Sequence, residues 1–289
     1  MKRIFKVSTL IIFIFLLSGC FKEDKLSNDN VYTTIYPIHY ITNYLYGEHK
    51  SITSIYPNGA DVNNYELTSK QKETYGSGAL FVYNGLTDEI ELAREFADNN
   101  KNILLIDVTE EIPNKSLGTI EELWLSPKNY LKLAKNVKSY LVDYTTSKVV
   151  SEYIEGKYKE LEEKISYMEA DLRNIANTAK TDGSSVLITS SNKLKFLEKY
   201  GFEVISLDNE NLSEATIKSN FKNGKYKNIF LCNNDIKTDL ITELEKKYKA
   251  NIINVNMLYT LTDSESANNE NYETIMTTFI DNIRNTALS

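Results

Sequence analysis

The sequence predicts an α/β protein of two lobes, each with a roughly four-stranded parallel sheet flanked by helices, joined by one long helix. Short runs rich in β-branched and aromatic residues alternate with helical runs, first in one set and then in a second. Such alternation indicates βαβ units and a parallel sheet. A long helical pattern separates the two sets, and 289 residues are enough for one large domain or two modest ones.

The strand candidates fall into two groups of similar spacing. The first group comprises residues 31–36, 51–56, 79–84 and 102–107. Helical runs begin within it near Ile38, Thr68 and Asp88. The second group comprises residues 185–190, 202–207, 228–233 and 251–256, separated by helical runs near 193–200, 214–223 and 238–248. A last helix is expected near 271–285, so each lobe repeats the same alternation.

Two helices are expected between the groups. Pro127 suits the first turn of a helix that runs to about Tyr144, since its missing N–H has no intrahelical partner there. The second runs from about Ser147 to Ala179 and spans roughly 45–50 Å at 1.5 Å per residue. One apolar stripe follows it, made of Val150, Ile154, Tyr158, Leu161, Ile165, Met168 and Leu172. A coiled coil fits less well because the stripe is short, so we expect a stiff connector that packs against both lobes and permits modest closure.

The N-terminus carries an export signal. Basic residues at 2, 3 and 6 precede an apolar run, 7–17, which is too short for a comfortable membrane span. The run ends in Leu17-Ser18-Gly19-Cys20, which resembles a bacterial lipobox. That resemblance implies cleavage before Cys20 and attachment of lipid there, which would anchor the protein on the extracytoplasmic face of the cell membrane. The alternative is an ordinary secretory signal with a chance cysteine.

Charge and cysteine content exclude several classes. Loss of residues 1–19 removes three basic residues and takes the net charge from −7 to −10, so no nucleic-acid partner is expected. Cys232 is then the only free thiol, and no disulfide framework is expected. Cys232 lies in a strand-like run, where a small buried hydrophobe is the expected role. A catalytic cysteine needs a histidine partner, and both His39 and His49 are far away in the sequence.

Six runs share their order and spacing with one family. They include TTIYPIHYITNYLYG, SIYPNGADVNNYELTSKQ, ALFVYNGLTDE, ELWLSPKN, LITSSNKLKFLEKYG and INVNMLYTLTD, at 33–47, 54–71, 79–89, 122–129, 187–201 and 253–263. In these runs the chain resembles the solute-binding lipoproteins of zinc and manganese ABC importers (cluster A-I, family 9). The resemblance covers residues 31–285, essentially the whole mature chain.

The resemblance implies a monomer that captures a solute between its lobes and presents it to an ABC permease and ATPase. Zinc or manganese would be the transported ligand, and no resident cofactor is expected. The expected organisation is a signal peptide at 1–19, a tether at 20–30, an N-terminal lobe at 31–126, a helical region at 127–182 and a C-terminal lobe at 183–289.

The family's four metal-ligand positions fall on Asn63, Glu122, Ser191 and Asn256. Only Glu122 is a usual strong ligand, because Zn²⁺ prefers imidazole, thiolate and carboxylate. The other three offer neutral oxygens, and Ca²⁺, which accepts such oxygens, needs six to eight of them. We therefore expect weak binding of Zn²⁺ or Mn²⁺. Amide and hydroxyl groups instead suit an organic ligand.

Two other readings stay open. The chain is alternatively an accessory or interaction lipoprotein of the same fold, which binds a non-metal solute or nothing in the cleft. His39 is either a cleft ligand or a packed residue near the first helix, whereas His49 is expected at the surface. An enzyme is not expected: the chain has no GxGxxG after the first strand and no Walker pattern, and Ser190-Ser191 has no credible general base.

Overall fold

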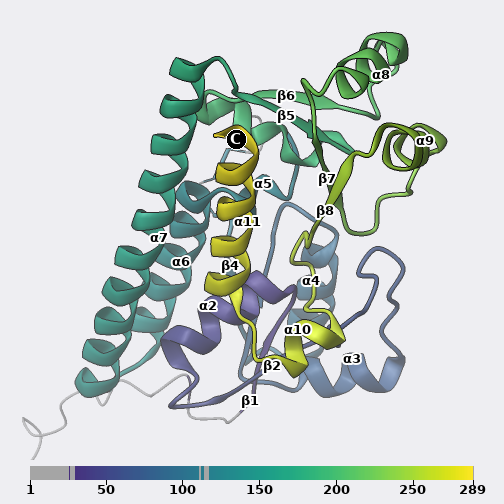
Figure 1. The fold of residues 1–289 in the computed structure, drawn as a ribbon. Coiled ribbons are helices and arrows are strands. Elements are labelled where there is room, and N and C mark those ends of the chain that lie inside the picture. Colours follow the sequence, from purple (N-terminus) through teal and green to yellow (C-terminus); the bar gives the residue numbers. More distant parts are fainter. Residues whose placement is uncertain (1–25, 27–29, 111, 114–116, 289) are drawn as a thin grey trace, which may run out of the picture.

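The computed structural model describes residues 26, 30–110, 112–113 and 117–288, and it contains two four-stranded parallel sheets (Figure 1). The first has the order β2-β1-β3-β4, and its strands are β1 (Asn30–Thr33), β2 (Ser51–Ser54), β3 (Leu80–Tyr83) and β4 (Leu104–Asp107). The second has the order β6-β5-β7-β8, and its strands are β5 (Val186–Thr189), β6 (Glu203–Ser206), β7 (Asn228–Cys232) and β8 (Asn251–Val255). The predicted fold class is confirmed.

Most strands end before their predicted last residue. Asn84, Ser190, Asn233 and Asn256 were expected within strands and instead open the loops that follow β3, β5, β7 and β8. Their side chains hydrogen-bond to nearby backbone or side-chain groups, as those of Asn and Ser often do where a strand gives way to a turn. Polar groups therefore collect at the carboxyl edges of both sheets.

Helices flank each sheet. The first lobe has α2 (Tyr36–Tyr46), α3 (Ser69–Gly76) and α4 (Glu89–Asn99). The second has η2 (Asn192–Tyr200), α8 (Glu214–Lys222), α9 (Asp239–Tyr248), α10 (Asp263–Ala267) and α11 (Tyr272–Ala287). Local capping explains several starts: Thr68, Thr262 and Asn271 each begin a helix with a reciprocal capping box. The run near 193–200 is a 3₁₀ helix.

The connecting region contains α5 (Glu122–Leu125), α6 (Pro127–Tyr144) and α7 (Lys148–Asp182). Helix α7 ends at Gly183, whose φ of 69° is a left-handed cap that glycine adopts without strain. Its predicted stripe is buried or packed against the core. Helix α7 contacts α2 of the first lobe and η2 of the second, and lies alongside α6 and α11 (Figure 1). It is therefore the connector between lobes that its pattern predicts.

One hydrophobic core runs through both lobes. The same cluster of buried side chains contains Val31 and Leu80 from the first sheet, Leu187 and Phe230 from the second, and Trp124 between them. Leu26, within the segment predicted as a tether, is also buried in this cluster. Shared burial of this kind couples the lobes, because separating them would expose apolar surface to water.

None of the helices in the described part of the chain is long and apolar enough to cross a membrane. The predicted signal peptide and Cys20 lie outside the described residues.

Candidate interlobe site

The loops at the carboxyl edges of the two sheets meet between the lobes. In α/β sheets this edge is where ligands bind. The segment after β2 touches the segment after β8, and the segment before α5 touches both η2 and the segment after β8. The bonds are Gly59 N to Leu261 O (2.8 Å), Thr260 Oγ1 to Ala60 O (3.3 Å), Thr119 Oγ1 to Lys193 O (3.5 Å) and Trp124 Nε1 to Met257 O (2.7 Å). All four segments that carry the predicted ligand residues therefore lie in one region.

Asn63 lies on the exposed loop after β2. The Asp61 carboxylate organises this loop: it accepts hydrogen bonds from Asn63 N at 3.2 Å and from Asn64 Nδ2 at 2.7 Å. The Asp61 carboxylate is therefore engaged in an Asx turn within its own loop.

Glu122 is buried, with only 3% of its side chain exposed. Its Oε1 accepts hydrogen bonds from Lys199 Nζ at 2.5 Å and from Asn129 Nδ2 at 3.3 Å. Its Oε2 accepts one from Gly118 N at 3.0 Å. Both oxygens of the strongest predicted ligand are thus engaged, and its charge is neutralised by an ammonium from the second lobe.

Lys199 is held in place by its neighbour Tyr200. The Tyr200 hydroxyl donates to Glu169 Oε2 on α7 at 2.5 Å and lies 3.1 Å from Ser126 Oγ, just before α6. The Arg173 guanidinium lies 5.2 Å from the centre of the Tyr200 ring, within cation–π range. These contacts tie the C-terminal end of η2 to the connecting helices, so that Lys199 faces Glu122.

Ser191 lies beside a second ion pair. Asp235 accepts hydrogen bonds from Ser190 Oγ and from Lys193 Nζ, both at 2.6 Å. Burial alone would raise the pKa of Asp235, but Lys193 and the two serines lower it overall. Ser191 Oγ lies close enough to the Asp235 carboxylate to help lower its pKa. This oxygen atom is buried, and it has no hydrogen-bond partner of normal geometry among the residues that the structure describes.

Asn256 has every hydrogen-bonding position of its side-chain amide in use. Its Oδ1 accepts from Asn233 Nδ2 at 3.1 Å and from Leu258 N at 2.7 Å. Its Nδ2 donates to Thr260 O at 3.4 Å and to Glu265 Oε2 at 2.6 Å. An amide has two donors and one acceptor oxygen, so no lone pair is left to face an ion.

A transition metal does not fit this set of groups. No imidazole occupies any of the four positions, and the one carboxylate among them is neutralised. Across the described ranges no group of three or more His, Cys, Asp and Glu residues is arranged to hold a metal ion. His39 is packed, with its Nδ1 3.2 Å from Thr33 Oγ1, and burial lowers its pKa. His49 is exposed, as predicted. The four residues remain a predicted site.

Comparison with known proteins identifies the family. Residues 31–286 match the family described as zinc-uptake complex component A, periplasmic (ZnuA). The chain belongs to this family. Its members are the solute-binding components of ABC importers for zinc and manganese.

Individual relatives are distant in sequence and similar in fold. The chain is 21% identical over 218 residues to the manganese-binding lipoprotein MntA of Halalkalibacterium halodurans. The aligned region covers 72% of this chain and 71% of MntA. The crystal structure of the metal-dependent lipoprotein YcdH of Bacillus subtilis covers 90% of this chain and 100% of that one, with 21% identity and a TM-score of 0.74. The zinc-bound ZnuA-like domain of Streptococcus pneumoniae AdcA covers 91% and 100%, with 19% identity and a TM-score of 0.72.

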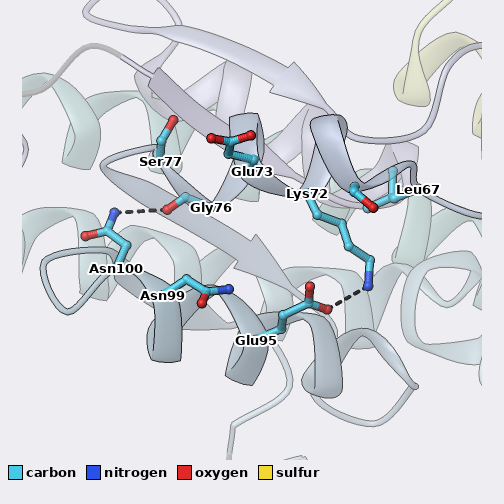
Figure 2. A pocket seen from close by; sticks show the side chains of 9 residues that line it. Leu67, Lys72, Glu73, Gly76, Ser77, Glu95, Asn99 and Asn100 are labelled. Carbon is cyan, nitrogen blue, oxygen red and sulfur yellow. Dashed lines mark hydrogen bonds and ion pairs between the residues drawn. The ribbon is translucent and has the colours of Figure 1, made fainter.

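Three cavities of this ZnuA-family chain are lined by residues other than the four predicted ligands. One of about 660 Å³ lies between α3 and α4, where the Lys72–Glu95 ion pair and the bond from Asn100 to Gly76 O cross it (Figure 2). The others, of about 670 and 580 Å³, lie between α7 and α11 and beside α8.

Sequence reasoning missed the partners of the predicted ligands. Lys199, Asp235 and Glu265 each engage one of the segments at the predicted site. Lys199 comes just before the Tyr200-Gly201 pair of a matching run, but nothing in that run indicates that its ammonium reaches Glu122.

Proposed function

We propose that this chain is the solute-binding component of an ABC importer, held by lipid on the extracytoplasmic face of the membrane. It captures a solute between its lobes and presents it to a permease and an ATPase. The observation that carries the proposal is the family match over residues 31–286. The two parallel sheets, whose carboxyl edges meet between the lobes, provide the place for a solute.

A reconstituted transporter tests this role. The lipidated protein is added to proteoliposomes that contain the permease and ATPase encoded beside its gene. We expect it to stimulate ATP hydrolysis, and a genome without such neighbours would favour the accessory role instead. Cys20→Ala provides the control for anchoring, because it should move the protein from the membrane fraction to the soluble fraction. If the variant stays with the membrane, the lipid anchor is wrong.

The cargo is a separate question. The names of relatives point to zinc or manganese, but the four predicted positions offer no free strong ligand. The ion pair between Lys199 and Glu122 favours a second candidate, an accessory lipoprotein that holds a non-metal solute or nothing at this place.

Elemental analysis with metal-titrated melting separates the two candidates. A ligand that binds only the folded state raises the melting temperature as its concentration rises. A shift with Zn²⁺ or Mn²⁺ that Glu122→Ala abolishes would place metal cargo at the predicted site. No metal by elemental analysis and no shift at high micromolar metal would exclude metal transport by this cleft.

A catalytic role for Ser190 finds no chemical support. Its hydroxyl donates to Asp235, whose lowered pKa makes it a weak base. Burial opposes the charge on Lys193, but the bond to Asp235 raises the Lys193 pKa overall, so this amine is protonated and cannot accept a proton. A serine without a general base is a poor nucleophile.

A further inference from the structure

The ion pair between Glu122 and Lys199 joins two segments that are far apart in the chain. Glu122 is the first residue of α5 in the connecting region, and Lys199 lies in η2 of the second lobe. The two side chains differ in exposure: 3% of Glu122 and 51% of Lys199 is exposed. A carboxylate buried to this degree requires a compensating cation, whereas a half-exposed ammonium remains hydrated. The carboxylate therefore depends on the lysine more than the lysine depends on the carboxylate.

Contacts of neighbouring residues anchor both sides of the ion pair. Tyr200, the next residue, is fixed to Glu169 on α7 and lies against Ser126. The carboxylate is fixed as well, by Gly118 N on one oxygen and Asn129 on the other. The carboxylate is therefore held in place, and the residue next to Lys199 is anchored, so the entropy cost of forming the pair comes mainly from the lysine side chain.

A free divalent cation at Glu122 would meet two obstacles. It would have to displace the ammonium from Oε1 or accept a like charge beside it, and like charges at close range repel. It would also find the Asn256 amide at the second lobe already bound to Asn233, Leu258, Thr260 and Glu265. Two predicted ligand positions are thus closed independently, by different internal partners.

We propose that Lys199 is the specificity-determining residue of the interlobe site: its ammonium is a tethered cation that neutralises Glu122 between the lobes and excludes a free divalent metal. The site is then closed by the protein's own side chain. The proposal rests on the proposed function only in taking this cleft as the binding region, and it does not depend on transport.

Lysine substitutions test the proposal, with ZnCl₂ and MnCl₂ as the probes. The variants are Lys199→Met, Lys199→Arg and the control Lys195→Met. Lys195 is an exposed lysine of the same 3₁₀ helix, and its side chain lines the cavity beside α8. Metal affinity is measured by competition with a chromophoric chelator, and stability by thermal melting. We expect K199M to melt below the wild type without metal and to bind Zn²⁺ at least about tenfold more tightly than K195M. Wild type, K199R and K195M should show no metal-dependent melting.

Two results would overturn the proposal. The first is one Zn²⁺ or Mn²⁺ bound per wild-type chain at micromolar metal. The second is a K199M variant that binds metal no better than K195M. Neither result bears on stimulation of the ATPase, which tests transport separately.

Neutralising the carboxylate gives a second measurement that holds even if K199M does not fold. Glu122→Gln should melt closer to the wild type than K199M does, because it leaves a hydrated ammonium instead of a buried anion. The double variant E122Q/K199M should then fold and melt close to E122Q. A double variant that melts as low as K199M, or fails to fold, would contradict the charge compensation on which the proposal depends.

Discussion

Glu89 gives the sharpest prediction about stability. This carboxyl lies in the first turn of α4, is buried, and accepts a hydrogen bond from Asn84 N at 2.7 Å. Burial raises its pKa from 4.5 to about 7, although the bond from Asn84 works in the opposite direction. The nearby Asp107 raises it further. The folded protein therefore prefers Glu89 protonated at mildly acidic pH.

The sign of the effect follows from proton binding. A carboxyl whose folded-state pKa lies above its unfolded value binds its proton more tightly when folded, so its contribution to stability is complete below the unfolded pKa of 4.5. That contribution is lost as the pH rises through about 7. One pKa unit corresponds to 1.36 kcal/mol, so the difference in the free energy of unfolding between the two ends of this window is about 3 kcal/mol.

Glu89→Gln removes the titration while it keeps an oxygen to accept the bond from Asn84. We expect the variant to match the wild type near pH 4.5 and to be more stable by about 3 kcal/mol at pH 8. At about 2–4 °C per kcal/mol this corresponds to a melting temperature higher by about 6–12 °C. Urea unfolding can be followed by the fluorescence of Trp124, the single tryptophan, which is buried in the core.

The matched control is Glu91→Gln on the same helix, where the carboxylate is exposed and paired with Arg94. We expect its difference from the wild type to change little with pH, since exposed pairs contribute about 0–1 kcal/mol. If the difference between E89Q and wild type is the same at pH 5 and pH 8, the buried carboxyl does not titrate in this window and the reasoning is refuted.

Three further outcomes are expected. Tyr259→Phe removes the hydroxyl that donates to buried Glu121 at 2.9 Å, and should lower the free energy of unfolding by about 1–3 kcal/mol in urea; no loss would mean that water replaces the donor. Asn256→Asp replaces the amide that donates to Glu265 with a second carboxylate, and should lower the free energy of unfolding by about 1–3 kcal/mol. Millimolar Ca²⁺ should restore part of this stability. A variant as stable as the wild type would contradict the bond at 2.6 Å. Cys232 is buried, and burial raises its pKa to about 11, so a thiol reagent at pH 8 should label it far more slowly in native protein than in urea; equal rates would place the thiol at the surface.

The fold could be predicted from local patterns because each element carries its own signal. The stripe on α7 and the proline at the start of α6 specify helices without any distant partner. Strand ends carry no such local signal. At Ser190 and Asn256 the side chain binds loop groups instead of continuing the ladder, and a hydrophobic run does not indicate where that begins.

The candidate site could be predicted only in part. The neutral residues at three of the four family positions already indicated weak metal binding. The identity of their partners depends on residues that the fold brings together from far apart. Glu122 and Lys199 are separated by 77 positions, and the neighbouring Tyr200 is bound to Glu169 on α7. No local pattern encodes such a pairing.

The way the lobes are joined bears on how a solute would enter. The core is continuous through both lobes, and Trp124, Tyr259 and Lys199 each form a bond that links the connecting region to the second lobe. A wide hinge motion would break all of these bonds and expose the shared core. Movement of the loop after β2 would break its bonds to the segment at 260–266, such as the bond from Asn58 Nδ2 to Ser266 Oγ, and the packing of Val62 against the core, but it would leave the rest of the shared core in place. Entry by movement of this exposed loop therefore costs less than separation of the lobes.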